Sequence, residues 1–161
     1  MVQYEVLLLL GGNVGDPVVT LGQAERLLGV RAGQVLTRSR DHWTLPWGFT
    51  DDRLFLNRAL LLSTAMAPDE LLGEVLSIET TLGRRRTAGV RYGARTIDID
   101  VLLIGGSVVN TPGLEVPHPR MHERIFALAP AADIAPGWVH PKLGLTVLQL
   151  LNHLLQHPMG A

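Results

Sequence analysis

Runs of apolar residues, interrupted by glycine, proline and acidic residues, divide the chain into short strands and helices. Unbroken or β-branched apolar runs are typical of strands. Four such strands are predicted, over residues 5–10, 34–43, 54–63 and 96–104. Leucines at helical spacing between them, preceded by capping residues or proline and followed by glycine, are typical of helices. Two helices are predicted, from Asp16-Pro17 to Gly29 and from Ala67-Pro68 to Gly83, with residues 11–15 as a turn before the first.

The element order β-α-β-β-α-β predicts an α+β fold with a ferredoxin-like core. In that arrangement the sheet is antiparallel and both helices pack on one face, so the opposite face is left free for a ligand. The rest of the chain is predicted to form short strands at 108–109 and 114–116, a helix from 119 or 120 to 128, and a helix over 146–155 capped by Thr146. Because no repeat or linker interrupts it, residues 1–161 are expected to form one domain.

Two aspartates lie in the middle of the strand predicted over residues 96–104. Alternation along a strand places Ile97, Ile99, Val101 and Leu103 on one face. Asp98 and Asp100 share the other face, about 6.6 Å apart at a rise of roughly 3.3 Å per residue. Two adjacent carboxylates repel each other unless a cation lies over them, and a hard, oxygen-seeking ion such as Mg²⁺ fits them best. The alternative is an edge strand that exposes two solvated aspartates.

Arginines are concentrated directly before this strand. The chain has 14 Lys and Arg residues, and Lys142 is its single lysine. Five arginines fall within twelve residues: Arg84, Arg85, Arg86, Arg91 and Arg95. Planar guanidinium groups with paired donors suit phosphate oxygens. The cluster therefore indicates an anion site beside the carboxylates, with a solvated basic loop as the alternative.

Composition narrows the class of protein. The net charge is −1, which argues against a nucleic-acid partner, and the absence of cysteine excludes disulfides and thiolate metal sites. No apolar run approaches the ~20 residues of a membrane helix, and the N-terminal residues lack the basic region of a signal peptide. We therefore expect a cytoplasmic protein without a membrane partner.

A second dense stretch, residues 116–126, places His118 between two prolines that fix its backbone. A histidine that contacts phosphate, with Arg124 nearby, is favoured over a zinc site or a plain surface loop. Phe55 and Asn57 share a face of the strand predicted over 54–63, and Phe126 follows His118. Two rings and an amide could form a slot for a flat heterocycle, although isolated phenylalanines are usually core residues.

These motifs together resemble the 6-hydroxymethyl-7,8-dihydropterin pyrophosphokinase family of folate synthesis. The resemblance rests on residues 95–105 (RTIDIDVLLIG) and 116–126 (VPHPRMHERIF). Residues 11–16 (GGNVGD), 55–57 (FLN), 78–79 (IE) and 83–84 (GR) extend it over nearly the whole chain in order.

The resemblance implies an Mg²⁺-dependent diphosphokinase that transfers pyrophosphate from ATP to the pterin hydroxymethyl group and releases AMP. Asp98 and Asp100 would hold two Mg²⁺ ions, and Arg84 and Arg95 would complete the catalytic set. The implied ATP contacts are Glu79, Arg84, Arg86, Arg91, Tyr92, Leu114, His118 and Arg124. The implied pterin contacts are Thr44, Leu45, Phe55, Asn57 and Phe126. The partners would be these two small molecules, the chain would act as a monomer, and the loop over 83–94 would close over ATP.

Two other functions compete with this interpretation. Another Mg²⁺-dependent nucleotidyl or phosphoryl transferase on a ferredoxin-like sheet would share the carboxylates and arginines but need no pterin slot. An RNA-recognition sheet would display aromatic residues on its central strands, where this chain has Asp98 and Asp100. Replacing either aspartate with alanine should abolish turnover only if the two carboxylates hold the metal.

Overall fold

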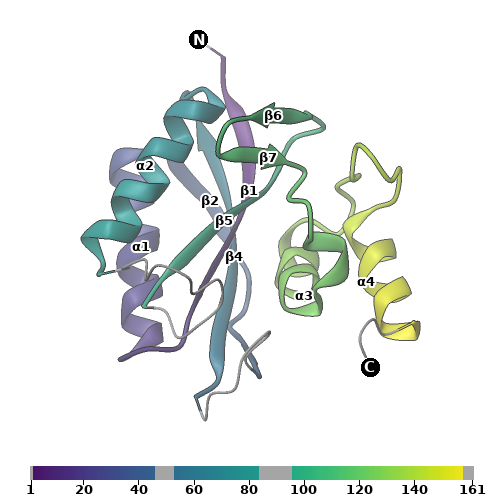
Figure 1. The fold of residues 1–161 in the computed structure, drawn as a ribbon, viewed down its shortest axis with the longest axis horizontal. Coiled ribbons are helices and arrows are strands. Elements are labelled where there is room, and N and C mark those ends of the chain that lie inside the picture. Colours follow the sequence, from purple (N-terminus) through teal and green to yellow (C-terminus); the bar gives the residue numbers. More distant parts are fainter. Residues whose placement is uncertain (1, 46–52, 84–95, 158–161) are drawn as a thin grey trace.

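The computed structural model describes residues 2–45, 53–83 and 96–157 (Figure 1). The strands are β1 (Tyr4–Gly12), β2 (Gln34–Arg38), β3 (His42–Thr44), β4 (Phe55–Thr64), β5 (Asp98–Ile104), β6 (Val109–Thr111) and β7 (Leu114–Val116). The helices are α1 (Pro17–Arg31), α2 (Pro68–Thr81), the 3₁₀ turn η1 (Met121–Glu123), α3 (Ile125–Ile134) and α4 (Val147–Gln156). This mixture of helices and antiparallel strands confirms the predicted α+β class.

One antiparallel sheet organises the fold. Its strands follow the order β2-β4-β1-β5, and β3 also pairs with β4. β1 lies between β4 and β5, with Gly11 opposite both Asn57 and Asp98. β6 and β7 form a separate hairpin. The pairing of β1 with both β4 and β5 therefore brings Gly11, Asn57 and Asp98 into one row.

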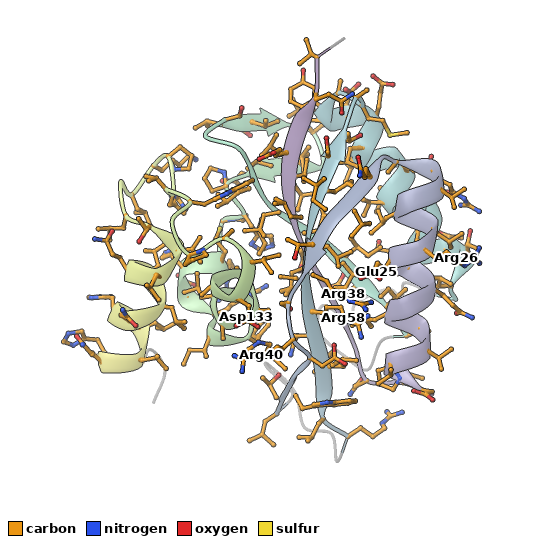
Figure 2. The ribbon with its side chains drawn as sticks, turned by 180° about the vertical axis from the view of Figure 1, so that it is seen from behind. Glu25, Arg26, Arg38, Arg40, Arg58 and Asp133 are labelled. Atoms are coloured by element: carbon orange, nitrogen blue, oxygen red, sulfur yellow. The ribbon has the colours of Figure 1, made fainter. Side chains whose placement is uncertain are left out.

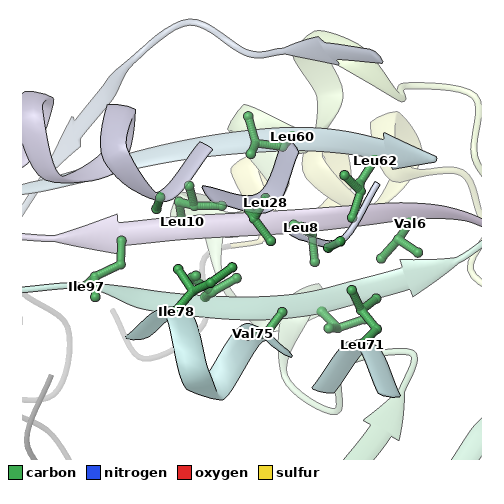
Figure 3. Packing of buried hydrophobic residues seen from close by; sticks show 14 of the residues in the cluster. Val6, Leu8, Leu10, Leu28, Leu60, Leu62, Leu71, Val75, Ile78 and Ile97 are labelled. Atoms are coloured by element: carbon green, nitrogen blue, oxygen red, sulfur yellow. The ribbon is translucent and has the colours of Figure 1, made fainter. Parts of the chain in front are cut away.

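Helices α1 and α2 pack on the same face of the sheet, as predicted. Their buried side chains meet those of β1, β4 and β5 (Figure 3). Residues of this core include Val6, Leu8, Leu10, Leu28, Leu60, Leu62, Leu71, Val75, Ile78 and Ile97. Side chains of Val, Leu and Ile contribute roughly 1.5–3 kcal/mol each on burial, which makes this layer a main source of stability.

The prediction that the opposite face is left free is wrong for the part of that face against which α3 packs. Helices α3 and α4 pack there, on the side of the sheet away from α1 and α2 (Figure 1). Leu7 and Leu9 of β1 and Ala59 of β4 are buried against α3 and α4 residues such as Leu128 and Leu150. The reason is that β1 is apolar on both faces, so both faces need a covering layer. The site must therefore lie beyond the end of this second core.

The predicted alternation along β5 is also wrong at one position. Leu7 pairs with Leu103 but Leu8 pairs with Val101, which leaves Leu102 as the extra residue of a β-bulge. Leu103 consequently packs with α3 and α4, and Ile104 takes the place expected for Leu103 in the α1–α2 core. The bulge lies after Asp98 and Asp100, so their shared face is unchanged.

Two predicted elements are divided by irregular backbone. The strand predicted over 34–43 is two strands, β2 and β3, separated by residues 39–41. The helix predicted to reach Leu128 is the turn η1 followed by α3, because Arg124 has extended backbone angles (φ −124°, ψ 108°) between them. Three glycines also differ from prediction: Gly11 and Gly12 belong to β1 rather than to a turn, and α1 continues past Gly29 to Arg31.

Helix starts follow the predicted capping residues. The Asp16 carboxylate accepts a hydrogen bond from the Val19 N–H (3.4 Å), and the Thr146 hydroxyl accepts one from the Gln149 N–H (3.1 Å). Glu70 accepts a bond from the Ala67 N–H (3.3 Å) at the start of α2. Among the helices in the described ranges, none has the length and apolar character that crossing a membrane requires.

Candidate active site

A row of residues crosses four strands of the sheet just beyond the α3–α4 core. His42 of β3 pairs with Asn57 of β4, Asn57 pairs with Gly11 of β1, and Gly11 pairs with Asp98 of β5. Paired residues point to the same face, and the buried neighbours Leu10, Leu56 and Ile97 point to the α1–α2 side. The row therefore lies on the face that carries α3, with the amide of Asn57 and the carboxylate of Asp98 on either side of Gly11.

Gly11 is a site residue that the sequence pattern did not reveal. A Cβ at this position would lie 3.4 Å from Asn57 Oδ1. Any larger side chain would therefore rise between Asn57 and Asp98 and fill the floor between them. A glycine at the end of an apolar strand was the available signal, but its meaning depends on which strands lie beside it.

Asp98 and Asp100 lie on this face with intermediate exposure, as predicted. Asp100 pairs with Leu9, two residues along β1 from Gly11, so the two carboxylates are neighbours on the same face of the sheet. Across residues 2–45, 53–83 and 96–157, no group of three or more His, Cys, Asp or Glu side chains could hold a metal ion. A pair of carboxylates nevertheless fits Mg²⁺, which is usually bound through one or two carboxylates and completes its shell with water and substrate phosphate.

Glu79 fixes the strand between the two aspartates. Its carboxylate, on α2, is buried with 2% exposure and accepts a hydrogen bond from the Ile99 N–H (2.7 Å). Ile99 pairs with Leu10 on one side of β5, and this N–H points to the other, which is the edge of the sheet. The bond gives the buried Ile99 N–H, which has no strand partner on the edge side of β5, an acceptor. It also holds the backbone from which Asp98 and Asp100 project.

His118 lies at the carboxylate end of the row. Its backbone N–H donates to the Leu102 carbonyl (2.9 Å) on β5, and its Nδ1 accepts from the Arg120 N–H (3.1 Å). Burial, followed by the positive charge of Arg124, lowers the pKa of His118 from 6.5 to about 4, against an opposing effect of Asp98. The imidazole is therefore neutral at pH 7, and its proton is on Nε2, which is a hydrogen-bond donor.

This lowered pKa predicts a pH-dependent stability. Between pH 6.5 and about 4 the unfolded chain protonates His118 but the folded chain does not, so the free energy of unfolding falls as the pH falls. The loss should reach about 3 kcal/mol by pH 4. Urea denaturation of the wild type and of His118→Gln at pH 7, 5.5 and 4.5 should show the wild type losing more stability. Parallel pH profiles would contradict it.

Thr44, Phe55 and Asn57, three of the residues predicted for the heterocycle slot, lie at the other end of the row. Asn57 Nδ2 donates to Thr44 Oγ1 (2.8 Å), and Leu45 follows Thr44 as an exposed residue. Phe55 shares the face of Asn57 by alternation along β4. Phe126 packs against the α3–α4 core, and the Arg124 guanidinium lies 5.4 Å from its ring centroid. The structure thus brings Thr44, Phe55, Asn57 and Phe126 to the same side of the sheet.

The remaining predicted residues are distributed as follows. Arg84, Arg86, Arg91, Tyr92 and Arg95, and the loop expected to close over ATP apart from Gly83, lie outside the described residues. Leu114 is buried in the α1–α2 core. Arg124 stands at the N-terminus of α3, close enough to His118 to affect its pKa. Of the predicted ATP contacts within the described ranges, His118 and Arg124 are therefore brought together with Asp98.

Paired carboxylates beside an arginine and a neutral imidazole donor, on an antiparallel sheet covered by helices, are the kinds of group that can bind a divalent ion and phosphate oxygens. Comparison with known proteins gives the particular family. The chain belongs to the 7,8-dihydro-6-hydroxymethylpterin-pyrophosphokinase family, whose pattern matches residues 7–136.

Curated relatives agree with this assignment, and solved structures resemble the chain in fold. The chain is 45% identical over 131 residues to a 2-amino-4-hydroxy-6-hydroxymethyldihydropteridine pyrophosphokinase of Methylorubrum extorquens, covering 81% of this chain and 82% of the relative. It is 45% identical over 126 residues to the Bacillus subtilis protein of that name, covering 78% and 74%. The fold resembles Plasmodium falciparum HPPK-DHPS solved with pteroate, with a TM-score of 0.80 at 15% identity. The match covers 96% of this chain and 45% of that longer one.

Proposed function

We propose that this pyrophosphokinase takes the pyrophosphoryl group from ATP, transfers it to the hydroxymethyl oxygen of 6-hydroxymethyl-7,8-dihydropterin and releases AMP. Transfer of pyrophosphate to hydroxymethyldihydropterin, a step of folate biosynthesis, is the activity of its family. The row Asn57–Gly11–Asp98 is the observation that indicates which substrate binds at which end of the site. It supports a heterocycle over one end and a polyphosphate over the other.

The spacing of the row suits this transfer. Asn57 and Asp98 are separated by two strand spacings, about 10 Å at their backbones. A flat bicyclic ring bound at Asn57 would extend its substituent over Gly11 towards Asp98. The nucleophile would then meet the phosphate chain above the floor that Gly11 leaves open, and positioning of this kind accounts for much of the rate of phosphoryl transfer.

Asp98 and Asp100 would hold two Mg²⁺ ions. When bound, these ions would offset the phosphate charge and favour in-line displacement at the β-phosphorus. The protein's own contribution is to keep two like charges adjacent on one strand, which the Glu79–Ile99 hydrogen bond supports by holding the strand backbone.

Cationic and neutral donors would bind the triphosphate. His118 would donate its Nε2–H to a phosphate oxygen, and Arg124 beside it would supply a charged donor. Arg84 and Arg95 would stabilise the transition state. The other ATP contacts would come from Glu79, Arg86, Arg91, Tyr92 and Leu114.

The pterin would be read at its edge and covered on its faces. Because Asn57 Nδ2 is already bonded to Thr44, its Oδ1 is the atom that would accept from a ring N–H. The Thr44-Leu45 backbone would contact the same edge. Phe55 and Phe126 would stack on the two faces of the ring.

The fold topology, domain extent, location and oligomeric state complete the proposal. A ferredoxin-like core is supported by the strand order β2-β4-β1-β5 with α1 and α2 on one face. We place the chain as a single domain over residues 1–161 that acts as a cytoplasmic monomer, with its two small-molecule substrates as partners.

Product analysis tests the proposed reaction. The purified chain, ATP, Mg²⁺ and 6-hydroxymethyl-7,8-dihydropterin should give AMP and the pterin diphosphate in equal amounts, because a whole pyrophosphoryl group moves. A dihydropterin that lacks the hydroxymethyl oxygen should give no AMP, since the nucleophile is missing. Formation of ADP, or AMP that does not depend on the pterin or on Mg²⁺, would overturn the proposal.

A further inference from the structure

A single carboxylate joins α3 to the start of β3. Asp133 accepts hydrogen bonds from the Arg40 backbone N–H (3.2 Å), Arg40 Nε (3.3 Å), Arg40 Nη2 (3.1 Å) and His42 Nε2 (2.8 Å). Its side chain is 17% exposed and that of His42 is 20% exposed. Figure 2 shows Asp133 and Arg40 next to each other, where the sheet meets α3. These bonds link residues more than ninety positions apart in the chain.

Asp133 lies at the C-terminal end of α3, where the helix dipole disfavours its negative charge. Burial also opposes its ionisation, but the hydrogen bonds from Arg40 and His42 outweigh burial and lower the pKa of Asp133 below its usual range. The carboxylate is therefore ionised at pH 7 and is held by its contacts with β3.

The segment that Asp133 holds is an irregular one. The Ser39 N–H donates to the Ala59 carbonyl (2.9 Å), and His42 pairs with Asn57. The chain therefore advances three residues from Ser39 to His42 while β4 advances only two from Ala59 to Asn57, as in a β-bulge. Arg40 is bonded to Asp133 on the α3 side, and Asp41 accepts a bond from Arg58 Nε (2.7 Å). In Figure 2 Arg58 lies on the α1 side of the sheet, so the irregular segment is held from both faces.

The held segment leads directly to the proposed pterin edge. His42 follows it, and Asn57 Nδ2 donates to the His42 carbonyl (3.4 Å) and to Thr44 Oγ1 (2.8 Å). β3 itself is only three residues long, so its own pairing with β4 fixes it weakly. We propose that Asp133 is a positioning residue for the pterin: through His42 it fixes the register of β3 and so preforms the Thr44–Asn57 pair that reads the ring.

This inference rests on the proposed pterin edge, and kinetics of an isosteric variant test it. Asp133→Asn keeps the size of the side chain but removes the charge that holds His42. Its KM for hydroxymethyldihydropterin should rise about tenfold, the factor that losing a charged hydrogen bond represents. The KM for ATP should stay within about twofold, because the triphosphate end is on β5 and beside His118. Equal changes in both constants, or none in the pterin KM, would overturn the proposal.

A matched control separates positioning from general stability. Glu25→Gln removes a carboxylate of similar exposure (19%), which forms a 3.0 Å ion pair with Arg38 between α1 and β2. It should lower the melting temperature by a few degrees at most, as Asp133→Asn should, but leave both KM values unchanged. A pterin KM that rises equally in the two variants would assign the effect to stability and overturn the proposal.

Two further variants distinguish failure of this proposal from failure of the proposed pterin edge. His42→Phe keeps a ring but removes the Nε2 donor, so it should reproduce the pterin KM of Asp133→Asn even if that variant folds poorly. Thr44→Val removes the acceptor of Asn57 and tests the edge itself. If Thr44→Val leaves the pterin KM unchanged, the edge is wrongly assigned. Thr44→Val is also combined with Asp133→Asn in one double variant. If the pterin KM of the double variant rises by the full product of the two single effects, the two residues act independently and Asp133 is not a positioning residue.

Discussion

Asp98→Asn and Asp100→Asn are each expected to abolish pyrophosphoryl transfer, with kcat lowered about a thousandfold or more. Each variant keeps the shape of the side chain and removes the negative charge that a divalent ion needs. Both aspartates have intermediate exposure, so the substitution leaves no buried polar group without solvent. Stability should be unchanged or slightly raised, since one member of a like-charged pair is removed. Steady-state AMP formation and a thermal melt measure the two quantities.

The control for this pair is an aspartate outside the site. Asp69 is exposed in the first turn of α2, and Asp69→Asn should keep wild-type kcat. Raising the Mg²⁺ concentration should recover part of the activity of Asp98→Asn or Asp100→Asn if the lost function is metal binding. Either variant turning over within about twofold of the wild type would show that the metal is not held there.

Local sequence patterns were sufficient for most of the elements but not for the layers. The apolar run of β1 correctly predicted a buried strand. It could not show that α3 and α4 would cover the second face, because that covering comes from residues more than a hundred positions later. The bulge at Leu102 is similar: every residue from Val101 to Ile104 is apolar, so no polar residue marks the point where alternation changes.

Part of the candidate site could also be predicted from local sequence, and part depends on how distant elements pack together. Asp98 and Asp100 are two residues apart, so strand geometry alone places them together. Gly11 and Asp133 gain their meaning from the register of β1 and from the docking of α3, and a single sequence carries neither. The residue pattern suggested a phosphate contact for His118 and a heterocycle contact for Asn57, and the family resemblance specified the two ligands as ATP and the pterin. The structure adds which atom of each is a donor and which is already bonded.

Glu79→Ala should lower both stability and activity, the second large effect that we expect. The variant leaves the Ile99 N–H without its acceptor in a place where Ile99 is 5% exposed, and it opens a cavity beside the core. These losses should lower the free energy of unfolding by about 2–4 kcal/mol. Because β5 then lacks its edge contact between Asp98 and Asp100, kcat should fall about ten- to a hundredfold. Urea denaturation and AMP formation at saturating Mg²⁺ measure these effects.

Glu74→Ala and Glu79→Gln show which property of Glu79 is responsible. Glu74 is on the same helix, with its carboxylate 3.8 Å from Arg31, so its removal should change stability by less than about 0.5 kcal/mol. Glu79→Gln keeps an oxygen that can accept from Ile99, so most stability and kcat should return if the hydrogen bond is what holds β5. If Glu79 acts only through its proposed contact with ATP, both Glu79 variants should raise the KM for ATP with little loss of stability. A stable Glu79→Ala protein with normal kcat would exclude the strand-holding role.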